Sequence, residues 1–453
     1  MVSQMSVLAV GSVMAPRSQM GFSLAWHIVL ACLGVGLPGV VLFMEWQGQR
    51  TGDVNYRLLA RRLARVLGVL FAVGAVSGTI LSFEMGLLWS GLMERYGSVI
   101  GLPFAIEGFA FFIEAIFLGI YLYGWDRLSP RAHLWSGVPI LLAGVSSAFF
   151  VVCANAWMNS PQGFVERNGR LLSVSPWVAM FNKATGPETT HMILAALMVT
   201  GFVTASVYAV AMLRGRRDRY HRLGLLVPLT LACAITPVQI AVGDWAAHYV
   251  ADEQPAKLAA MEGLYRSQRG APEAIGGIYS DDALHGAVSV PKGLSLLTHW
   301  DPHAYVAGLD SVPADQRPPV NVVHLAFDAM VGIGFALLAL GVWLAWAWWR
   351  HRDIPPSAWF LRAVAVSGVA SVVAMELGWV TTEVGRQPWI VYGLLRVDRA
   401  ANPAAGIGWG LPLLLLVYLV LSGALVYVLR HMIADHPVPV APQDSDVIEF
   451  EVH

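Results

Sequence analysis

The sequence is short of charge and of cysteine, and each shortage excludes a kind of protein. Asp, Glu, Lys and Arg make up only 13% of the 453 residues, whereas soluble domains carry about 25%. The formal net charge is -1, so no basic surplus indicates a nucleic-acid partner. The three cysteines, Cys32, Cys153 and Cys233, lie far apart. A disulfide framework, a CxxCH haem attachment and a thiolate metal site are therefore all unsupported.

The chain has long apolar runs instead, and 56% of its residues are hydrophobic. A membrane-spanning helix needs about 20 such residues, and about nine stretches meet that requirement. They lie near 22–44, 66–90, 104–124, 134–158, 189–213, 222–244, 322–349, 358–384 and 406–430. The first is too long for a cleavable signal peptide, so we expect it to stay in the membrane. The sequence predicts an all-α, polytopic integral membrane bundle.

Arginine is concentrated in alternate connections between these stretches. The connections after the odd-numbered stretches hold Arg50, Arg57, Arg61, Arg62, Arg65, Arg127, Arg131, Arg214, Arg216, Arg217, Arg219, Arg222, Arg350, Arg352, Arg362 and Arg430. Positively charged connections stay on the cytoplasmic side. We therefore expect the N-terminus outside and the C-terminus in the cytoplasm.

A single transmembrane body is expected over residues 1–435, because no internal repeat divides the chain. The tail 436–453 is Pro-rich and then acidic, and it should be flexible. The connection from about 245 to 321 far exceeds the roughly 15 residues beyond which loops are uncommon and often functional. By the orientation above, this loop lies on the outer face.

Ionisable and metal-ligating side chains inside apolar spans are costly and therefore indicate function. His27, His191, Met330 and Glu383 come from four different stretches, at a similar expected depth below the outer surface. Imidazole nitrogen and thioether sulfur suit haem iron, and a His/Met pair is typical of a low-spin, electron-transferring haem. One pairing that the residue types allow is His191 with Met330, leaving His27 and Glu383 as single ligands.

Each of these residues also has a simpler interpretation. A lone intramembrane histidine is more often a hydrogen-bonded packing residue, and a methionine more often fills the core. Glu383 could end its helix paired with Arg386 in interfacial water. Trp379 and Trp389 fit an aromatic belt as well as a cofactor wall.

Two acids lie seven residues apart in EGFAFFIE, namely Glu107 and Glu114. That spacing is two helical turns, about 10 Å along one helix face. Two carboxyl groups so placed inside a membrane suggest a proton relay, and the alternative is two separate interhelical hydrogen bonds.

Taken together, these residues resemble subunit I of the cytochrome bd-type quinol oxidases, across nearly all nine stretches. The resemblance rests on AWHIVL around His27, LPFAIEGFAFFIEAIFLGIYLYGWDRL over 102–128, ANAWMNSP over 154–161, QPAKLAAMEG over 254–263 and ELGWVTTEVGRQPW over 376–389. The strings GWDRL and GRQPW at that separation are highly specific. The resemblance implies that His191 and Met330 ligate a low-spin haem b. It implies that His27 and Glu383 ligate two high-spin haems, either haem b plus haem d or haem b twice.

The resemblance also implies roles in quinol binding and proton delivery. Lys257 and Glu262 match quinol-site residues of the outer loop, although their spacing alone would suit an amphipathic surface segment. Glu107 and Glu114 match two acids of the haem pocket that take part in proton delivery. Trp379 matches a tryptophan packed between haems. Glu376 and Arg386 match polar neighbours of the same pocket.

The chain departs from the family pattern at one charged position. Many members have an arginine two residues before the methionine ligand, whereas this chain has Asp328 in AFDAMVG. This substitution resembles the cyanide-insensitive branch, and we expect it to alter the surroundings of the low-spin haem. The outer loop resembles the short-loop form of the family.

The function implied by the resemblance is oxidation of a membrane quinol and reduction of O2 to water, in the bacterial inner membrane. Electrons would pass through the low-spin haem to the two high-spin haems, and proton motive force would arise without a pump. The implied partners are subunit II and a small accessory subunit. The residues alone leave two other classes open: a haem-bearing electron-transfer or redox-sensing protein, and a cofactor-free proton-coupled transporter.

Overall fold

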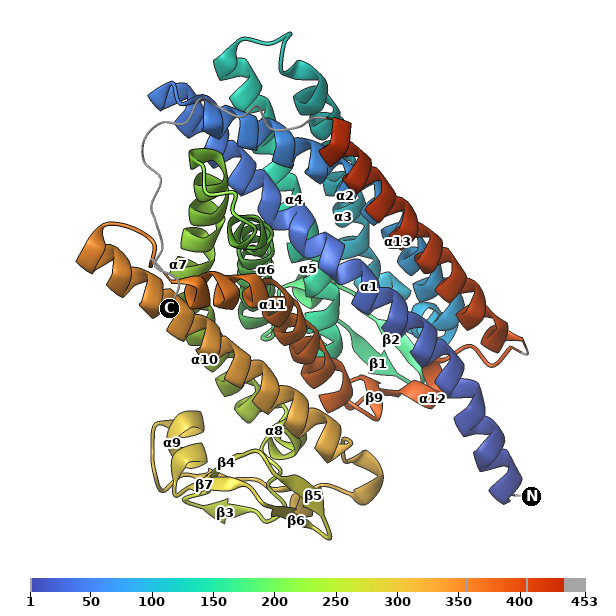
Figure 1. The fold of residues 1–453 in the computed structure, drawn as a ribbon. Helices are drawn as coiled ribbons and strands as arrows, with labels where there is room; N and C mark the ends of the chain where they lie inside the picture. Colours follow the sequence, from blue (N-terminus) through green and yellow to red (C-terminus); the bar gives the residue numbers. More distant parts are fainter. Residues whose placement is uncertain (1, 356, 405, 436–453) are drawn as a thin grey trace.

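The structure, a computed structural model, describes residues 2–355, 357–404 and 406–435, with side chains from residue 13 to residue 432. Within these residues nine helices are long and apolar enough to cross a membrane, which confirms the predicted number (Figure 1). They are α1 (Val2–Thr51), α2 (Val54–Leu88), α3 (Ser90–Gly124), α4 (Pro130–Asn159), α6 (Thr185–Leu213), α7 (Arg219–Glu253), α10 (Val320–His351), α11 (Ala358–Gly385) and α13 (Gly410–Asp435). The predicted flexible tail lies outside the described residues.

Short elements connect the long helices. The strands pair into two-stranded antiparallel sheets, which the sequence did not predict because each strand has only two or three residues. The short helices are α5 (Pro176–Met180), α8 (Pro255–Met261), α9 (Gly293–His299) and α12 (Val397–Ala400), with 3-10 turns η1 (Leu309–Ser311), η2 (Ala314–Gln316) and η3 (Ile407–Trp409). The strand pairs are β1 (Val165–Arg167) with β2 (Arg170–Leu172), β3 (Gln268–Arg269) with β8 (Tyr305–Val306), β4 (Glu273–Ile275) with β7 (Val288–Val290), β5 (Ile278–Ser280) with β6 (Ala283–His285), and β9 (Trp389–Val391) with β10 (Leu395–Arg396).

Local signals set the ends of several long helices. Asp53 caps α2 by accepting the backbone N–H of Asn55 at 2.9 Å, and its other oxygen accepts a hydrogen bond from Nε of Arg219 at 2.7 Å. Ser129 caps α4, with Pro130 at the first helical position. Between such caps the chain stays helical, because hydrocarbon offers no other partner for backbone N–H and C=O groups.

Glycine lets the helices approach one another closely. A Cβ on Gly36 in α1 would lie 2.2 Å from Oγ1 of Thr200 in α6, and that hydroxyl donates to the backbone oxygen of Cys32 at 2.8 Å. A Cβ on Gly201 in α6 would lie 2.6 Å from the backbone oxygen of Pro228 in α7. Close backbone contact of this kind is a common basis of helix association in membranes.

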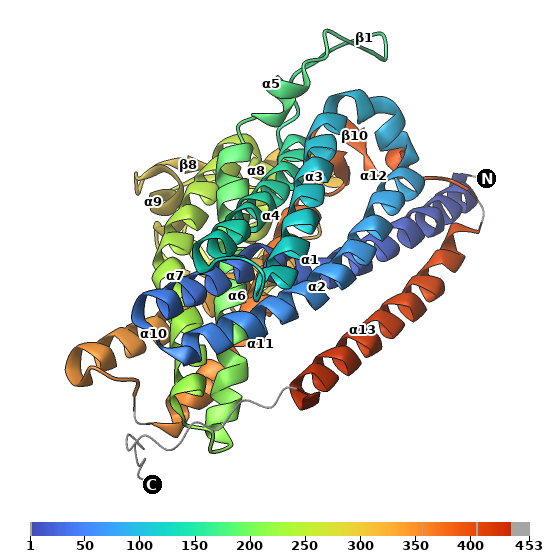
Figure 2. The same cartoon turned by 90° about the horizontal axis from the view of Figure 1, so that it is seen from above.

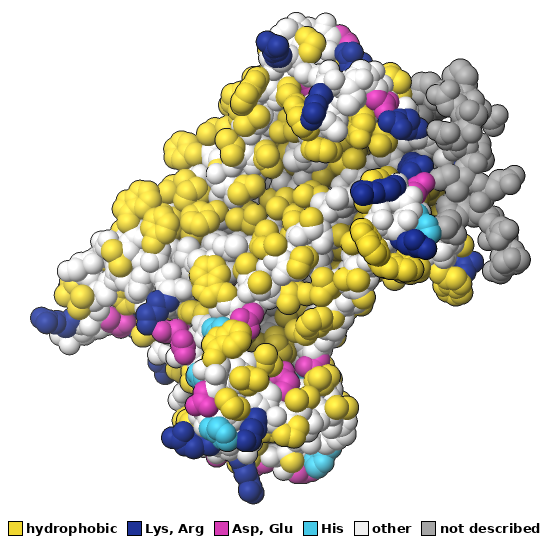
Figure 3. Space-filling model, turned by 90° about the vertical axis from the view of Figure 1, so that its left-hand side faces the viewer, with side chains coloured by type: hydrophobic (Ala, Val, Ile, Leu, Met, Phe, Trp, Pro, Cys, Tyr) yellow, Lys and Arg dark blue, Asp and Glu magenta, His cyan; other side chains and the backbone are white. Residues whose placement is uncertain are grey.

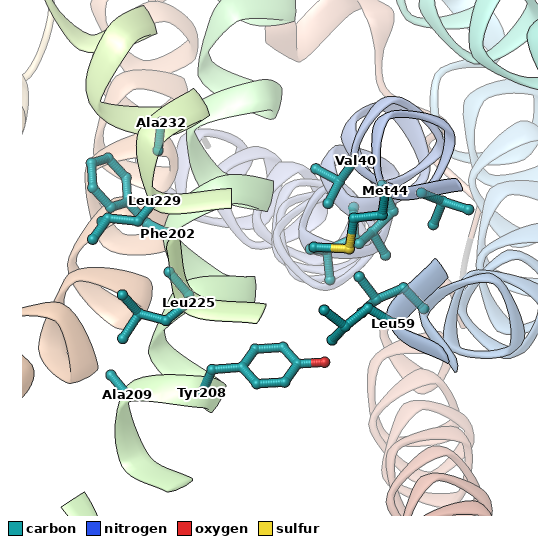
Figure 4. Close-up of a cluster of buried hydrophobic side chains, with 14 of the residues drawn as sticks. Val40, Met44, Leu59, Phe202, Tyr208, Ala209, Leu225, Leu229 and Ala232 are labelled. Carbon is teal, nitrogen blue, oxygen red and sulfur yellow. The ribbon is translucent and has the colours of Figure 1, made fainter. Parts of the chain in front are cut away.

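The largest hydrophobic core lies among α1, α2, α6, α7, α10 and α11. Figure 4 shows part of it, with Val40 and Met44 of α1 near Leu59 of α2, and Phe202 of α6 near Leu229 of α7. None of these five side chains is more than 2% exposed. The packing fixes the helices that carry the candidate site.

The two ends of the bundle differ in structure. The segment between α7 and α10 forms a lobe at one end, built from α8, α9 and the strands β3 to β8 (Figure 1). A band of hydrophobic side chains crosses the middle of the molecule, and charged side chains gather above and below it (Figure 3). Figure 2 shows α13 running along one side of the bundle, where it contacts α1 and α2.

The predicted outer loop corresponds to this lobe, with one correction to its start. The sequence prediction began the loop near residue 245, but α7 continues to Glu253. The segment DWAAHYVADE is polar enough to leave the hydrocarbon and still contains good helix formers. The helix therefore extends beyond the apolar run that the sequence criterion detects.

Candidate functional site

Helix α11 lies at the centre of the candidate residues. Trp379 packs in one apolar cluster with Ile28 of α1 and Met192 of α6. These two residues are the chain neighbours of His27 and His191. Trp379 is partly buried and packs against this cluster.

Met330 of α10 lies against the same part of α11. A Cβ on Gly378 would lie 3.1 Å from Sδ of Met330. Glu383 follows five residues later, about 7.5 Å along the helix, and its neighbour Val384 packs with Met261 of α8. The four candidate ligands, or their chain neighbours, thus meet along residues 378–384 of α11.

Position along each helix is a poor measure of depth in this molecule. His27 lies 25 residues beyond Val2, where α1 begins, which is about 38 Å of helix. His191 lies only six residues beyond Thr185, the start of its span. The sequence prediction counted both from the edge of the apolar run, so the shared cluster on α11 is the better indication of a common level.

His27 has one ring nitrogen available for a ligand. Its Nδ1 lies 2.7 Å from Oγ of Ser77 on α2, and that hydroxyl donates to the backbone oxygen of Gly74 at 3.0 Å. Ser77 therefore accepts a hydrogen bond from Nδ1–H, which leaves Nε2 with its lone pair. A hydrogen bond of this kind fixes the tautomer and orientation of a metal-binding histidine.

His191 makes no hydrogen bond of that kind. Its Nδ1 is buried and has no hydrogen-bond partner among the described residues. A Cβ on Gly243 of α7 would lie 3.4 Å from Cε1 of the ring. His191 and Met330 thus each face a glycine, Gly243 and Gly378, where a larger side chain would crowd the ligand atoms.

Glu383 is paired inside the protein. Its Oε2 accepts a hydrogen bond from Nη2 of Arg386 at 2.6 Å, and its Oε1 accepts one from Nδ2 of Asn155 at 2.5 Å. Arg386 is only 2% exposed and the side chain of Glu383 is 33% exposed, so the structure has the pairing that the simpler interpretation expects. Helix α11 ends at Gly385, shortly before Pro388, as expected where proline stops a helix.

Asn159, the last residue of α4, joins this pair to the outer loop. Its Oδ1 accepts hydrogen bonds from Nζ of Lys257 at 3.2 Å and from Nη1 of Arg386 at 3.1 Å. Its Nδ2 donates to Oε1 of Glu188 at 2.8 Å. Lys257 is 3% exposed and Glu262 is 5% exposed. The segment that carries them is therefore not an amphipathic surface helix.

Burial changes the acid–base behaviour of the loop residues. Loss of water lowers the pKa of Lys257 to about 8, although the charge of Glu188 opposes the shift. Burial raises the pKa of Glu262 well above its usual range, and the like charges of Glu273 and Asp328 raise it further. Glu273 lies close enough to Glu262 to raise the pKa of that carboxyl group, so the two acids favour a state in which they share one proton.

Asp328, where the chain departs from the family pattern, binds the outer loop. Its Oδ2 accepts the backbone N–H of Gly276 at 2.5 Å and lies 3.6 Å from Nε2 of His324. The ring nitrogens of His324 lie 2.6 and 2.9 Å from the backbone oxygens of Met261 and Gly276. An arginine has no acceptor for the N–H of Gly276, so the aspartate suits this attachment of the loop to α10.

A cavity of about 240 Å³ lies beside these residues. Its walls come from α8, from the segment 311–318 and from the chain after α11, including Trp389 and Tyr392. Arg386 also lines it, and Nε of that arginine is buried with no hydrogen-bond partner in the described part of the chain. Aromatic walls with a few polar groups are typical of sites for small molecules.

Glu107 and Glu114 both face α4. Oε1 of Glu107 accepts a hydrogen bond from Oγ of Ser147 at 3.0 Å. A Cβ on Gly144 would lie 3.5 Å from Oε1 of Glu114, which is only 6% exposed. The two acids therefore share one helix face, and Glu107 also makes the interhelical hydrogen bond of the alternative interpretation. Glu376 lies seven residues before Glu383, a spacing that puts both on one face of α11.

Several residues of the site were missed at the level of sequence. They are Asn155, Asn159, Glu188, Glu273 and His324. The motif ANAWMNSP contains the two asparagines, but nothing in its spacing indicates which one bridges other helices. Glu188 and Glu273 lie outside the apolar cores of the predicted spans, so burial could not be inferred for them.

The fold and the site define a class of protein. Met330 lies against α11, the chain neighbours of His27 and His191 share an apolar cluster with Trp379, and a buried lysine and glutamate lie on the loop segment whose first residues line a cavity with Trp389 and Tyr392. This is the arrangement of a membrane-bound oxidoreductase that binds haem and a small organic substrate.

Comparison with known proteins gives the particular family. The family model described as cytochrome bd terminal oxidase subunit I matches residues 15–437. A putative cytochrome bd menaquinol oxidase subunit I of Bacillus subtilis is 36% identical, over 93% of this chain and 96% of its own length. The cytochrome bd-II ubiquinol oxidase subunit 1 of Escherichia coli is 26% identical, over 84% and 87%. The structure of the bd oxidase from Geobacillus thermodenitrificans matches with a TM-score of 0.87 and 38% identity, over 94% of this chain and 99% of that one.

The chain belongs to the cytochrome bd terminal oxidase subunit I family. It is therefore part of a quinol:oxygen oxidoreductase of the bacterial inner membrane, with haem cofactors and a place in respiratory electron transport. Membership of an oxidase family leaves the transporter and redox-sensor alternatives without support.

The side chains fit haem as the bound group. Nε2 of His27 keeps a lone pair, Nδ1 of His191 makes no competing hydrogen bond, and glycines face His191 and Met330. Imidazole, thioether and carboxylate are all plausible axial donors for haem iron. The donor set and the space around it therefore agree with the family.

Proposed function

We propose that His191 and Met330 would hold a low-spin haem b as its two protein ligands. The observation that carries this proposal is their approach to α7 and α11 at glycines, 3.4 Å from a Cβ on Gly243 and 3.1 Å from one on Gly378. A histidine from α6 with a methionine from α10 would be the ligand pair typical of an electron-transferring haem. When bound, such a haem passes single electrons.

The single ligands of the two high-spin haems are His27 and Glu383 in this proposal. Each residue would supply the single protein ligand of one haem, and a haem held in this way would supply the chemistry of oxygen reduction. The two haems are haem b plus haem d, or haem b twice. Trp379 and Glu376 on α11 separate and border the two sites, and Arg386 balances the charge of Glu383, which is supported by their 2.6 Å hydrogen bond.

The quinol headgroup binds at the cavity beside α8, with Lys257 and Glu262 as its polar partners. Ammonium N–H groups of Lys257 donate to a quinol oxygen, and Glu262 accepts a hydroxyl proton as a general base. The nearby carboxyl group of Glu273, which raises the pKa of Glu262, supports this role. A pair that holds one proton has capacity for one more.

The proton route completes the proposal. With the loop on the outer face, protons from the quinol leave outside, and protons for water come from the cytoplasm along α3, through Glu114 and Glu107. Subunit II, with a small accessory subunit, covers the exposed helices and helps to carry protons across the low-dielectric interior. Charge separation then follows from the placement of the two reactions, without a pump.

A pyridine haemochrome assay on the purified complex counts the haem types, and the electron paramagnetic resonance spectrum of the intact complex separates low-spin from high-spin iron. The proposal expects one low-spin haem b and two high-spin haems. Replacing His27 by Ala should remove one high-spin signal, and Glu383→Ala should remove the other. Loss of the low-spin signal in either variant, with both high-spin signals kept, contradicts the assignment.

A further inference from the structure

Asn159 occupies a position that the known activity does not explain. It is the last residue of α4, is 1% exposed, and touches none of the candidate haem ligands. Its amide group nevertheless bonds side chains from three other helices. Nδ2 donates to Oε1 of Glu188 on α6 and to Oδ1 of Asn155 on α4 itself, at 2.8 and 3.3 Å. Oδ1 accepts from Lys257 of α8 at 3.2 Å, and from Arg386 at the end of α11 at 3.1 Å.

The chemistry of these partners requires an amide. Lys257 and Arg386 can only donate hydrogen bonds, whereas the carboxylate of Glu188 and Oδ1 of Asn155 can only accept them. A carboxylate at position 159 would accept hydrogen bonds from Lys257 and Arg386, but it would have no N–H group to donate to Glu188 and Asn155. An ammonium or guanidinium group would do the reverse. A carboxamide provides both kinds of bond within one short side chain.

The bonds around Asn159 form a closed ring with Glu383. One arm runs from Asn159 to Arg386 and on to Oε2 of Glu383 at 2.6 Å. The other runs from Asn159 to Asn155 and on to Oε1 of Glu383 at 2.5 Å. Both oxygens of that carboxylate are therefore held by donors that Asn159 itself bonds. In a dry interior, hydrogen bonds connected in this way strengthen one another.

Lys257 is attached to this ring from the side of the outer loop. Its amino group bonds Oδ1 of Asn159, and its side chain lies against α11, where a Cβ on Gly385 would be 2.9 Å from Cγ of the lysine. Nε2 of Gln254 lies 3.3 Å from the same Oδ1 of Asn159. It also donates a hydrogen bond to the backbone oxygen of Asn159 at 2.8 Å. A substrate that draws Lys257 toward it therefore acts on the same oxygen that holds Arg386.

We propose that Asn159 is a positioning residue that couples the quinol-site lysine, Lys257, to the orientation of the Glu383 carboxylate. This inference rests on the proposed roles of Lys257 and Glu383. Its consequence is that one side chain, remote from both reactions, controls the apparent affinity for quinol and the signature of the haem that Glu383 holds.

The test measures two quantities on the assembled, haem-loaded complex. One is the KM for quinol, separated from kcat. The other is the optical spectrum and midpoint potential of the high-spin haems after reduction with dithionite, without quinol. Asn159→Leu removes every side-chain hydrogen bond at nearly constant volume. It should raise the KM about tenfold, the value of one hydrogen bond to a charged group, and shift one high-spin potential.

Asn159→Asp is the second variant, and its nearly identical shape makes it the safer one for folding. It keeps an acceptor for Lys257 and Arg386 and loses the donor to Asn155 and Glu188. We expect the high-spin potential to shift while the KM stays within about twofold of the wild type. This split between the two readouts is not expected of a residue that only stabilises the fold.

Asn182→Leu is the matched control. Asn182 is also a buried asparagine, 7% exposed, but its side chain bonds only the backbone of its own segment, at Ala179 and Ala184. It should change neither readout. Unchanged high-spin potentials in both Asn159 variants, or equal shifts in Asn182→Leu, overturn the coupling. If Lys257→Met leaves the KM unchanged or Glu383→Ala leaves the high-spin signals unchanged, the proposed function itself fails.

Discussion

Two buried polar clusters lie at opposite ends of α4, and they are built on different principles. Asn159 ends the helix, and His133 lies near its start, 26 residues earlier, or about 39 Å away. At the His133 end, Glu45 of α1 accepts hydrogen bonds from Gln49, Tyr121 and His133, at 2.9, 2.5 and 2.8 Å. The other ring nitrogen of His133 bonds the backbone oxygen of Tyr121 at 2.9 Å.

The cluster around Glu45 is satisfied within itself. Both oxygens of its carboxylate and both nitrogens of His133 have protein partners. The cluster around Asn159 leaves polar atoms unpaired: Nε of Arg386 and Oε1 of Gln254 are buried without a hydrogen-bond partner among the described residues. It also adjoins the cavity that Arg386 lines.

The difference teaches which cluster serves the fold and which serves the reaction. A saturated network has no capacity for a ligand, so its contribution is to hold α1, α3 and α4 together. A network next to a cavity that still has an unpaired donor and an unpaired acceptor can form hydrogen bonds with a substrate. Variants at the two ends should therefore fail in different ways.

The largest effect is expected at the proposed haem ligands, His191 and Met330. His191→Ala and Met330→Leu should each abolish the low-spin haem signal, because the iron loses one of two strong ligands. A reduced-minus-oxidised spectrum of the purified complex measures this. Met198→Leu, at a buried methionine of the main core in α6, is the control and should keep the signal. An unchanged low-spin band in both ligand variants would show that the ligands lie elsewhere.

The next largest effect is expected at the other cluster, around Glu45. Glu45→Gln leaves the imidazole of His133 without its ionic partner in a dry site, which costs about 3 kcal/mol of stability. Thermal unfolding in detergent, followed by helical circular dichroism, should show a clearly lower midpoint. The KM for quinol should not change. A raised KM without loss of stability would break the division between the two clusters.

A smaller effect, on the rate of oxygen reduction, is expected at Glu114 of α3. Glu114→Gln removes a proton carrier from the proposed route and should slow oxygen reduction about tenfold or more. Proton uptake into proteoliposomes, measured with a pH dye, reports the step directly. Glu94→Gln, at an exposed acid of the same helix, should change nothing. Normal uptake in Glu114→Gln would remove this residue from the route.

The smallest effect concerns pH at the quinol site. Because burial lowers the pKa of Lys257 to about 8, the ammonium form is lost as the pH rises through that value. The KM for quinol should then rise a few-fold between about pH 7 and pH 9. Lys257→Met should have a high KM with no such step, while Lys183→Met, at an exposed lysine, should keep it. A wild-type KM that is flat across this range contradicts the role of the ammonium group.

The sequence predicted the fold well because the membrane imposes simple rules. An apolar run of sufficient length must be helical, and all nine predicted stretches are helices within the described residues. Their ends were less predictable. Helix α7 continues into a polar segment, and the short strands of the outer lobe have no periodicity to detect.

The site was predicted in part, for a different reason. Ionisable residues inside apolar runs stand out, so the sequence indicated His27, Glu107 and Glu383 directly. Asn159 and Glu273 did not stand out, because an asparagine at a helix end and a glutamate in a loop are ordinary in sequence. Their importance arises from contacts between elements distant in the chain, such as the bond from Lys257 to Asn159.

One measurement tests the central claim that the outer lobe delivers quinol electrons to the haems. The complex carrying Glu262→Gln is mixed anaerobically with quinol or with dithionite, and haem reduction is followed by stopped-flow spectroscopy. Asp252→Asn, at an exposed acid just before the lobe, is the control. We expect reduction by quinol to be about 100-fold slower than in the wild type, with reduction by dithionite and the final spectrum unchanged. Reduction by quinol at the wild-type rate in Glu262→Gln would contradict the account.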